Sequence, residues 1–314
     1  MLSKVAEKLY WTARYMERVE STARLVSVYD SLLFDLPQEF DISWYNLVTL
    51  NSSESLFEKE YANRSELNVV KFLLADEANP SSMLSALNMV RENVRTTRDV
   101  LPYDYWEMVN ELHIFARGNI RQGIFRRARH KFLGQMIKGC QQINGSIMGT
   151  MSRDASWHFL RLGRNLERAD MATRLLDAGA VIQILSEAEI HMLIGQVVWG
   201  NVLRSSSADL SYRRTMRSAV RDCDVAAFLL YDPHFPRSLH FCLSAILAAV
   251  KKLPNSNEVV EKLQRILKTR YELENSQRLG DEFRDYLNQL QLDLGGLHLQ
   301  FSQTWFSLEQ KDTA

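Results

Sequence analysis

The segments RYMERVESTARLV (residues 14–26) and RNLERADMATRLL (residues 164–176) carry the same order of charges, 150 positions apart. Arginines and acidic residues stand at matching places, as Arg14, Glu17, Arg18, Glu20 and Arg24 in the first segment and as Arg164, Glu167, Arg168, Asp170 and Arg174 in the second. Because a solvated helix tolerates almost any order of charges, a repeated order requires a cause.

The surrounding sequence predicts an all-α fold, a bundle of helices. Only 13 glycines and 6 prolines interrupt the 314 residues, and apolar residues recur at helical spacing over long stretches. One such stretch is 81–101, and another runs over 259–294, where the same spacing continues almost to the C-terminus. No segment alternates apolar and polar residues between hairpin turns, which is the pattern of β-strands.

Two further pairs of segments predict a tandem duplication. WYNLV at 44–48 matches WGNVL at 199–203, and FLLADEANPSSMLSAL at 72–87 matches FLLYDPHFPRSLHFCL at 228–243. Three pairs in the same order favour two helical halves, packed as one unit, with a seam near 144–154. The expected halves are residues 1–150, with an Arg/Glu motif at 14–24 and an FLLxD corner at 72–82, and residues 151–314, with the same features at 164–174 and 228–238.

The FLLxD corner is interpreted as a helix–turn–helix connection. Ser82 and Ser238 each follow a proline and are expected to cap the next helix. Arg237 stands where the first half has Ser81. This arginine is the one addition to the corner that we include among the candidate binding residues.

Composition and charge exclude several classes of protein. Lys plus Arg and Asp plus Glu both number 38, so no net field attracts nucleic acid or an anionic membrane. Cys140, Cys223 and Cys242 lie far apart, which favours a reduced, intracellular chain over a disulfide framework. The N-terminal residues lack the apolar region of a signal peptide, and the longest apolar run, 241–250, is too short to span a bilayer. We therefore expect a cytoplasmic protein.

The repeated charges have two interpretations. On a surface helix, pairs such as Glu20 and Arg24 would contribute only about 0.2–0.5 kcal/mol each. However, Arg14 and Arg18 repel one another at i,i+4, as do Arg164 and Arg168, and a free surface has no reason to keep that arrangement twice. The alternative is a buried network, in which planar guanidinium groups bind carboxylates through two hydrogen bonds.

In the buried interpretation, two antiparallel helices face each other, and the arginines of each motif hold Glu17 or Glu167 of the other. Such a network is either a structural lock or a polar pocket for a carboxylate, phosphate or peptide group, and the sequence leaves both open. The candidate residues for binding a substrate or partner are Arg14, Arg18, Glu20, Arg24, Arg164, Arg168, Asp170, Arg174 and Arg237.

Several blocks resemble the signature blocks of the bacterial alpha-E domain family. They are YWTARYMERVESTARLV (10–26), WHFLRLGRNLERADMATRLL (157–176) and FLLYDPHFPRSLHFCL (228–243), and residues 89–112 resemble a further block. The resemblance covers nearly the whole chain. It departs at Thr12-Ala13, where the family usually has glycine before the arginine, as Gly163 precedes Arg164.

The resemblance implies an all-helical protein encoded beside, or fused to, a circularly permuted ATP-grasp ligase and a transglutaminase-like peptidase. The implied setting is the synthesis, attachment or trimming of a peptide or amide linkage. Our leading hypothesis is an accessory module that binds substrate or partner through the Arg/Glu cluster, with no cofactor of its own and ATP supplied only through the ligase. One alternative is a stand-alone amide or peptide transferase or hydrolase, with Glu17 or Glu167 as the catalytic general base. The other is a purely structural scaffold.

Other chemistry has weaker signals. Glu187 and His191 are spaced at i,i+4 without a second pair, so we expect no metal site, and no phosphate-binding loop or catalytic triad pattern is present. The most basic stretch, residues 116–132, has few aromatic residues, which together with zero net charge argues against nucleic-acid binding. We expect it to be a docking face for an acidic partner or an ordinary solvated helix.

Overall fold

The computed structural model describes residues 1–35, 43–185, 191–273 and 279–307, and the regular elements within these ranges are all helical. The all-α prediction is confirmed. The α-helices are α1 (Ser3–Asp35), α2 (Asn46–Leu50), α3 (Glu54–Glu60), α4 (Glu66–Leu74), α5 (Met83–Arg95), α6 (Tyr103–Ile124), α7 (Arg126–Thr150), α8 (Ala155–Leu185), α9 (His191–Ser205), α10 (Asp209–Met216), α11 (Asp222–Tyr231), α12 (Leu239–Val250), α13 (Asn257–Lys268) and α14 (Asp281–Phe301). In the described residues, no helix combines the length and apolar character needed to cross a bilayer.

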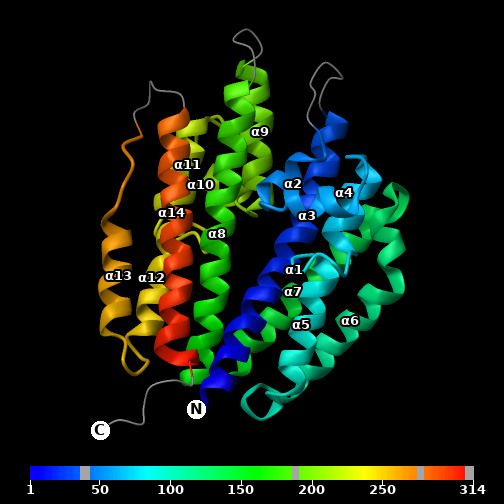
Figure 1. The fold of residues 1–314 in the computed structure, drawn as a ribbon. Coiled ribbons are helices and arrows are strands. Elements are labelled where there is room, and N and C mark those ends of the chain that lie inside the picture. Colours follow the sequence, from blue (N-terminus) through cyan, green and yellow to red (C-terminus); the bar gives the residue numbers. More distant parts are fainter. Residues whose placement is uncertain (36–42, 186–190, 274–278, 308–314) are drawn as a thin grey trace.

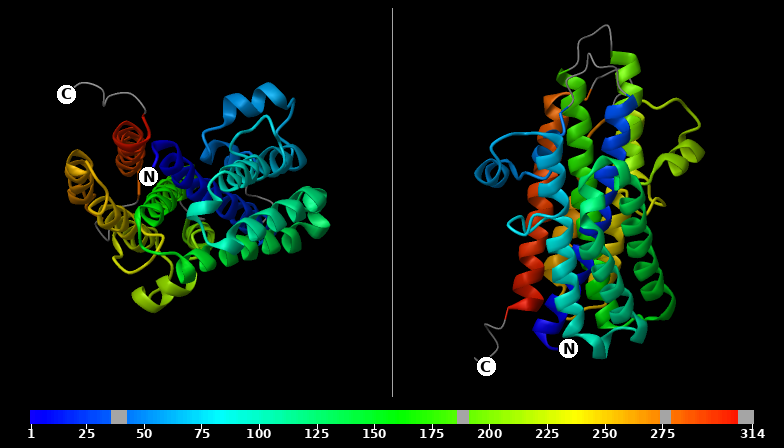
Figure 2. Two further views of the ribbon diagram at one scale, coloured as in Figure 1. Left: turned by 90° about the horizontal axis from the view of Figure 1, so that it is seen from below. Right: turned by 90° about the vertical axis from the view of Figure 1, so that its right-hand side faces the viewer.

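The two long helices α1 and α8 lie side by side at the centre of the bundle (Figure 1). Helices α5, α6 and α7 flank the pair on one side, and α12, α13 and α14 flank it on the other (Figures 1 and 2). Each central helix carries one of the two Arg/Glu motifs. The fold therefore brings segments about 150 residues apart in sequence into direct contact.

Helices α1 and α8 run parallel, so the expectation of an antiparallel pair is wrong. Tyr10 lies beside Gly163, and four residues further along each helix Arg14 pairs with Glu167. The contacts therefore advance in the same direction along both helices. Both helices also start at the same end of the bundle, where the Ser156 hydroxyl lies 3.8 Å from the Met1 sulfur. The reason is that α7 returns the chain to the end at which α1 begins (Figure 1).

Gly163 marks the closest approach of the two central helices. A Cβ atom built at this position would lie 2.0 Å from the Tyr10 carbonyl oxygen and 3.3 Å from the Ala13 Cβ. No other residue fits without moving backbone. Ala13 occupies the corresponding place in the first motif, so one glycine in the pair is sufficient for this contact.

The two FLLxD corners have the predicted capping geometry. The Ser82 hydroxyl accepts a hydrogen bond from the Ser85 backbone N–H at 3.2 Å, and the Ser238 hydroxyl accepts one from Phe241 at 3.1 Å. Both serines therefore start a helix, α5 and α12. The second corner places Arg237 one residue before the cap of α12. The duplication itself, and the division into halves at 144–154, stay predictions.

The continuous helical pattern over 259–294 is divided between two helices. Helix α13 ends at Lys268, and α14 begins at Asp281 after Gly280 at its N-cap. The two helices have different neighbours, because α13 packs against α12 and α14, whereas α14 also packs against α8. Each buries its own apolar face, with Leu263 and Leu290 as examples.

Candidate functional site

Glu167 of α8 is held by two arginines of α1. Arg14 Nε donates to Oε2 at 2.7 Å, and Arg18 donates from Nε to Oε1 at 2.7 Å and from Nη2 to Oε2 at 3.2 Å. The Glu167 side chain is only 4% exposed. The prediction that arginines of the opposing motif hold this carboxylate is confirmed, and we call these three residues the Glu167 site.

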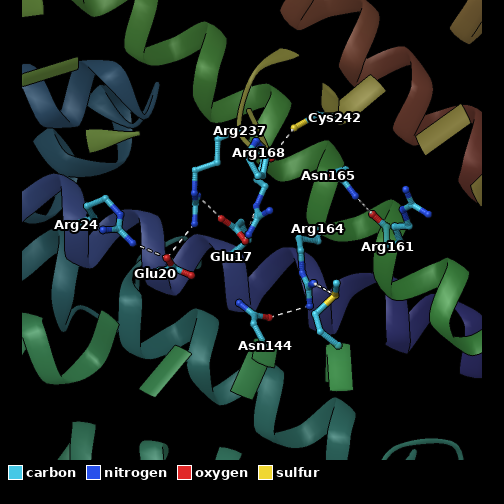
Figure 3. A network of polar contacts seen from close by, with 12 residues as sticks. Glu17, Glu20, Arg24, Asn144, Arg161, Arg164, Asn165, Arg168, Arg237 and Cys242 are labelled. Carbon is cyan, nitrogen blue, oxygen red and sulfur yellow. Dashed lines mark hydrogen bonds and ion pairs between the residues drawn. The ribbon is translucent and has the colours of Figure 1, made fainter. Parts of the chain in front are cut away.

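Glu17 of α1 is held by arginines from two other elements (Figure 3). Arg168 Nε of α8 lies 3.0 Å from Oε2, and Arg237, from the corner before α12, donates to Oε1. The contact with Arg168 is an ion pair without hydrogen-bond geometry, since Glu17 Oε2 and Arg168 Nε both lack a hydrogen-bond partner. The Glu17 side chain is 1% exposed.

Arg237 also connects Glu17 to Glu20. Its Nη2 donates to Glu20 Oε1 at 2.9 Å, and the same oxygen accepts from Arg24 Nη2 at 2.5 Å (Figure 3). One guanidinium group from the α12 corner therefore bridges two carboxylates of α1. We call Glu17, Glu20, Arg24, Arg168 and Arg237 the Glu17 site.

Both central carboxyl groups are strong acids in this setting. Burial alone would raise the pKa of Glu17, but Arg168 and Arg237 outweigh it and lower this pKa to about 2. In the same way, Arg14 and Arg18 outweigh burial and lower the pKa of Glu167 to about 2. Both groups are ionised at neutral pH, and their charge is compensated by nearby guanidinium groups.

Arg164 departs from the pattern of its counterpart Arg14. Its Nη2 donates to Asn144 Oδ1 on α7 at 2.9 Å, and its Nη1 lies 3.7 Å from the Met148 sulfur (Figure 3). Burial, and then repulsion from Arg168, lower the pKa of Arg164. Among the described residues Arg164 has no carboxylate within ion-pair distance, unlike Arg14.

Arg174 and Asp170 lie apart from both carboxylate sites. Arg174 Nε donates to Asp170 Oδ2 at 2.9 Å, and its Nη1 donates to the Leu50 carbonyl and to the Ser52 hydroxyl. Both side chains are 23% exposed, whereas that of Glu20 in the corresponding pair is 2% exposed. Arg174 also lines a cavity beyond the end of the network.

The sequence reasoning missed the aromatic cover of Arg14. The guanidinium carbon lies 5.0 Å from the centre of the Trp11 ring, and Arg14 Nη1 donates to the Tyr10 hydroxyl at 3.3 Å. That hydroxyl lies 2.9 Å from Nδ1 of His298 on α14. Tyr10 and Trp11 stand four and three positions before Arg14, a helical spacing that could have indicated them, but nothing in the sequence indicates His298.

The interpretation of residues 116–132 as a purely surface basic stretch is wrong at Arg129. This arginine is 1% exposed and pairs with Asp30 and Glu66, each at 2.7 Å. It also donates from Nε to the Gly123 carbonyl. Arg129 therefore links α1, α4 and the α6–α7 turn from inside the bundle.

A metal site has no donor set in the part of the chain that is described. No three His, Cys, Asp or Glu side chains there lie close enough together to hold an ion. Glu187, one of the two residues weighed as a metal pair, lies outside the described residues.

Comparisons with known proteins match nearly the whole chain. The alpha-E model, described as a predicted alpha-helical domain with a conserved ER motif, matches residues 1–306. The sequence contains two Glu-Arg pairs, Glu17-Arg18 and Glu167-Arg168, and both lie in the network described above.

Curated relatives are uncharacterized proteins of Mycobacterium bovis and Mycobacterium tuberculosis. Each is 23% identical over 94% of this chain, and a second Mycobacterium tuberculosis protein is 22% identical over the same share. The match covers 35% of each relative, so this chain spans about a third of their length. No solved structure matches the chain.

Proposed function

Because the chain belongs to the alpha-E family, we propose that it is an accessory binding module of an ATP-grasp ligase system that makes or modifies a peptide or amide linkage. In this proposal the Arg/Glu network holds an anionic group of the substrate or of the partner. The observation that carries the proposal is the excess of guanidinium groups around carboxylates that are already compensated.

The excess of positive charge lies beside the Glu17 site. Two acids, Glu17 and Glu20, are surrounded there by Arg24, Arg168 and Arg237, with Arg164 next to them. The Nε of Arg24 is buried without a hydrogen-bond partner, whereas the Nε of Arg168 is already in an ion pair with Glu17. An unused guanidinium donor next to a surplus of positive charge favours a carboxylate or phosphate, which arginine binds through two parallel hydrogen bonds.

The acid–base properties of the glutamates favour a binding module over a stand-alone enzyme. A carboxylate with a pKa of about 2 is a weak base at neutral pH, far from the range in which a general base is effective. Both oxygens of Glu167 also accept hydrogen bonds from arginines already. A proton acceptor in this setting would first have to lose its ion pairs, which is costly in a buried site.

The length of the relatives also supports an accessory role. This chain corresponds to about a third of each mycobacterial protein, so the same helical domain occurs there within a longer chain. The resemblance to the alpha-E family implies that an ATP-grasp ligase is the functional neighbour. A domain that works beside a ligase, in one chain or as a separate protein, has no need of its own nucleotide site.

The test is ligase-dependent product formation with Arg164→Met in place of the wild-type chain. Since Arg164 has no carboxylate partner, the variant should fold, while product formation should fall at least tenfold. Arg161→Met is the matched control, because Arg161 is a half-buried arginine on the same helix outside the network. Unchanged product formation with Arg164→Met, or turnover by the purified chain without any ligase, would refute the proposal.

A further inference from the structure

A cavity of about 280 Å³ lies beyond the Arg/Glu network, between α1, α2, α8, α9 and α14. Its apolar wall includes Leu25 and Leu47 from one side of the bundle and Leu175, Val198 and Val202 from the other. Of the eleven candidate site residues, Arg174 alone lines it. The volume is near the lower end of the range of about 300–1,000 Å³ for ligand pockets, which suits one amino-acid residue better than a long chain.

Amide, hydroxyl and charged side chains form the polar part of the wall. Asn46 of α2, Asn201 of α9, and Asn288 and Gln291 of α14 all line the cavity. The charged groups in the wall are compensated, because Arg174 pairs with Asp170, and Arg284 pairs with Asp177 at 2.9 Å. An apolar wall with neutral amides complements a neutral ligand that carries both donors and acceptors.

The side chain of Asn201 indicates which hydrogen-bonding group a ligand of this cavity would supply. Its Nδ2 donates to the Val197 carbonyl at 2.8 Å, which fixes the orientation of the amide, while its Oδ1 is buried without a hydrogen-bond partner. The residue is 6% exposed. Leaving a buried acceptor unpaired is unfavourable, and an N–H donor in the adjoining cavity would remove that cost.

We propose that this cavity binds a hydrophobic residue of a peptide, with the apolar side chain against the leucines and valines and the main-chain N–H that follows this residue donating to Asn201 Oδ1. The proposal deepens the proposed function, on which it rests for the expectation of a peptide substrate, by naming a side-chain class for that substrate. The amide side chains at the wall would pair with the remaining peptide groups. Arg174, which lines the cavity, belongs to the same motif of α8 as Arg164 and Arg168, which are proposed to hold the anionic group.

The test measures binding of small probes to the purified full chain by NMR titration, without any ligase. The first probe is N-acetyl-L-leucine N′-methylamide, and the glycine analogue lacks its side chain. The third probe, N-acetyl-L-leucine methyl ester, lacks the N–H that follows the leucine residue in the leucine amide. We expect saturable binding of the leucine amide, at least tenfold weaker binding of the glycine analogue, and about 3–10-fold weaker binding of the ester, the range of one hydrogen bond.

Variants then locate the site. Ala178→Phe should fill the cavity, in which Ala178 is a lining residue, and abolish binding. Asn201→Leu should fold, because it removes an unpaired acceptor, and should bind the amide and the ester equally. Asn165→Leu is the matched control, since Asn165 is 5% exposed and donates to the carbonyl four residues earlier but does not line the cavity.

Three outcomes would overturn the inference. They are no saturable binding of the leucine amide, equal binding of the glycine analogue, and an unchanged preference for the amide in Asn201→Leu. These results leave the proposed function untouched, because they involve neither the ligase nor Arg164. Conversely, loss of product in Arg164→Met with no binding in the cavity would retain the proposed function and retire the peptide pocket.

Discussion

The Glu167 site and the Glu17 site contain corresponding residues of the two motifs, yet different arginines surround them. Glu167 accepts hydrogen bonds from Arg14 and Arg18, which both belong to the opposing motif. Glu17 retains Arg168, the counterpart of Arg18, but has Arg237 in place of the counterpart of Arg14. That counterpart, Arg164, contacts α7 instead.

The difference shows how one motif can serve two purposes. At the Glu167 site two helices are joined by ion pairs that use the motif alone. At the Glu17 site the α12 corner supplies Arg237, which also binds Glu20, so three elements are joined. Arg237 takes the place beside Glu17 that the counterpart of Arg14 would have, and Arg164 contacts Asn144 instead. Arg164 is therefore the arginine that we propose to meet a ligand.

The largest expected effect comes from Glu167→Gln. The substitution leaves Arg14 and Arg18 buried without their counter-charge, which should lower the free energy of unfolding by about 3–5 kcal/mol, as measured by urea denaturation. The control is Glu58→Gln, which removes the Arg64 pair of a side chain that is 53% exposed and should cost far less, because solvent screens an exposed ion pair. Equal losses for the two variants would mean that the Glu167 site is not a buried network.

Acid should reduce stability through both sites. The folded-state pKa of about 2 for Glu17 and for Glu167 lies below the ordinary value of 4.5, so their stabilisation is complete above about pH 4.5 and disappears as the pH falls towards 2. Each group accounts for roughly 3 kcal/mol of that loss at most. Urea denaturation at a series of pH values should give a shallower acid limb for Glu167→Gln and for Glu17→Gln than for the wild type. Three parallel curves would contradict the assignment.

Arg237→Ser should separate the two sites, since it gives the second corner the residue that the first has at Ser81. Glu17 would keep only Arg168, and we expect a loss of about 2 kcal/mol, typical of a hydrogen bond to a charged group. Arg221→Ser serves as the control, because Arg221 pairs with Asp224 but is 59% exposed. A loss as small as that of the control would show that Arg237 does not stabilise the Glu17 site.

The smallest effect is expected for Arg164→Met. Replacing a buried arginine that lacks a carboxylate with an apolar side chain of similar length should change stability by no more than about 1 kcal/mol. The mirror change, Arg14→Met, removes a partner of Glu167 and should cost about 3 kcal/mol. The measurement is thermal and urea unfolding of the two variants side by side. Equal losses of unfolding free energy would refute the difference between the sites.

The repeated motif predicted the contacts of the central pair but not its direction. Arg14, Arg18 and Arg168 face the carboxylates of the opposing motif, as the repeat indicated, because like charges at i,i+4 need buried partners. An antiparallel pair would also have allowed these contacts, so the motif alone does not decide the direction. The path of α7 decides it, and that path depends on packing across the whole chain.

Other features depend on residues that no local pattern connects. Arg164 donates to Asn144 on the preceding helix. Arg129 pairs with Asp30 and Glu66, although Arg129 lies among exposed basic residues. The WYNLV and WGNVL segments indicate only a repeat in the sequence, yet their asparagines, Asn46 and Asn201, line the same cavity. Spacing along one helix does not reveal such contacts, because each joins residues of different elements.

The short distance at Gly163 means that the two ion-pair sites are mechanically linked. A single methyl group there would push against the Tyr10 carbonyl, one turn before Arg14 and one turn before Glu167. The resulting wedge would open the helix pair at the place where both sites begin. One added carbon atom should therefore let water reach two carboxylates at once.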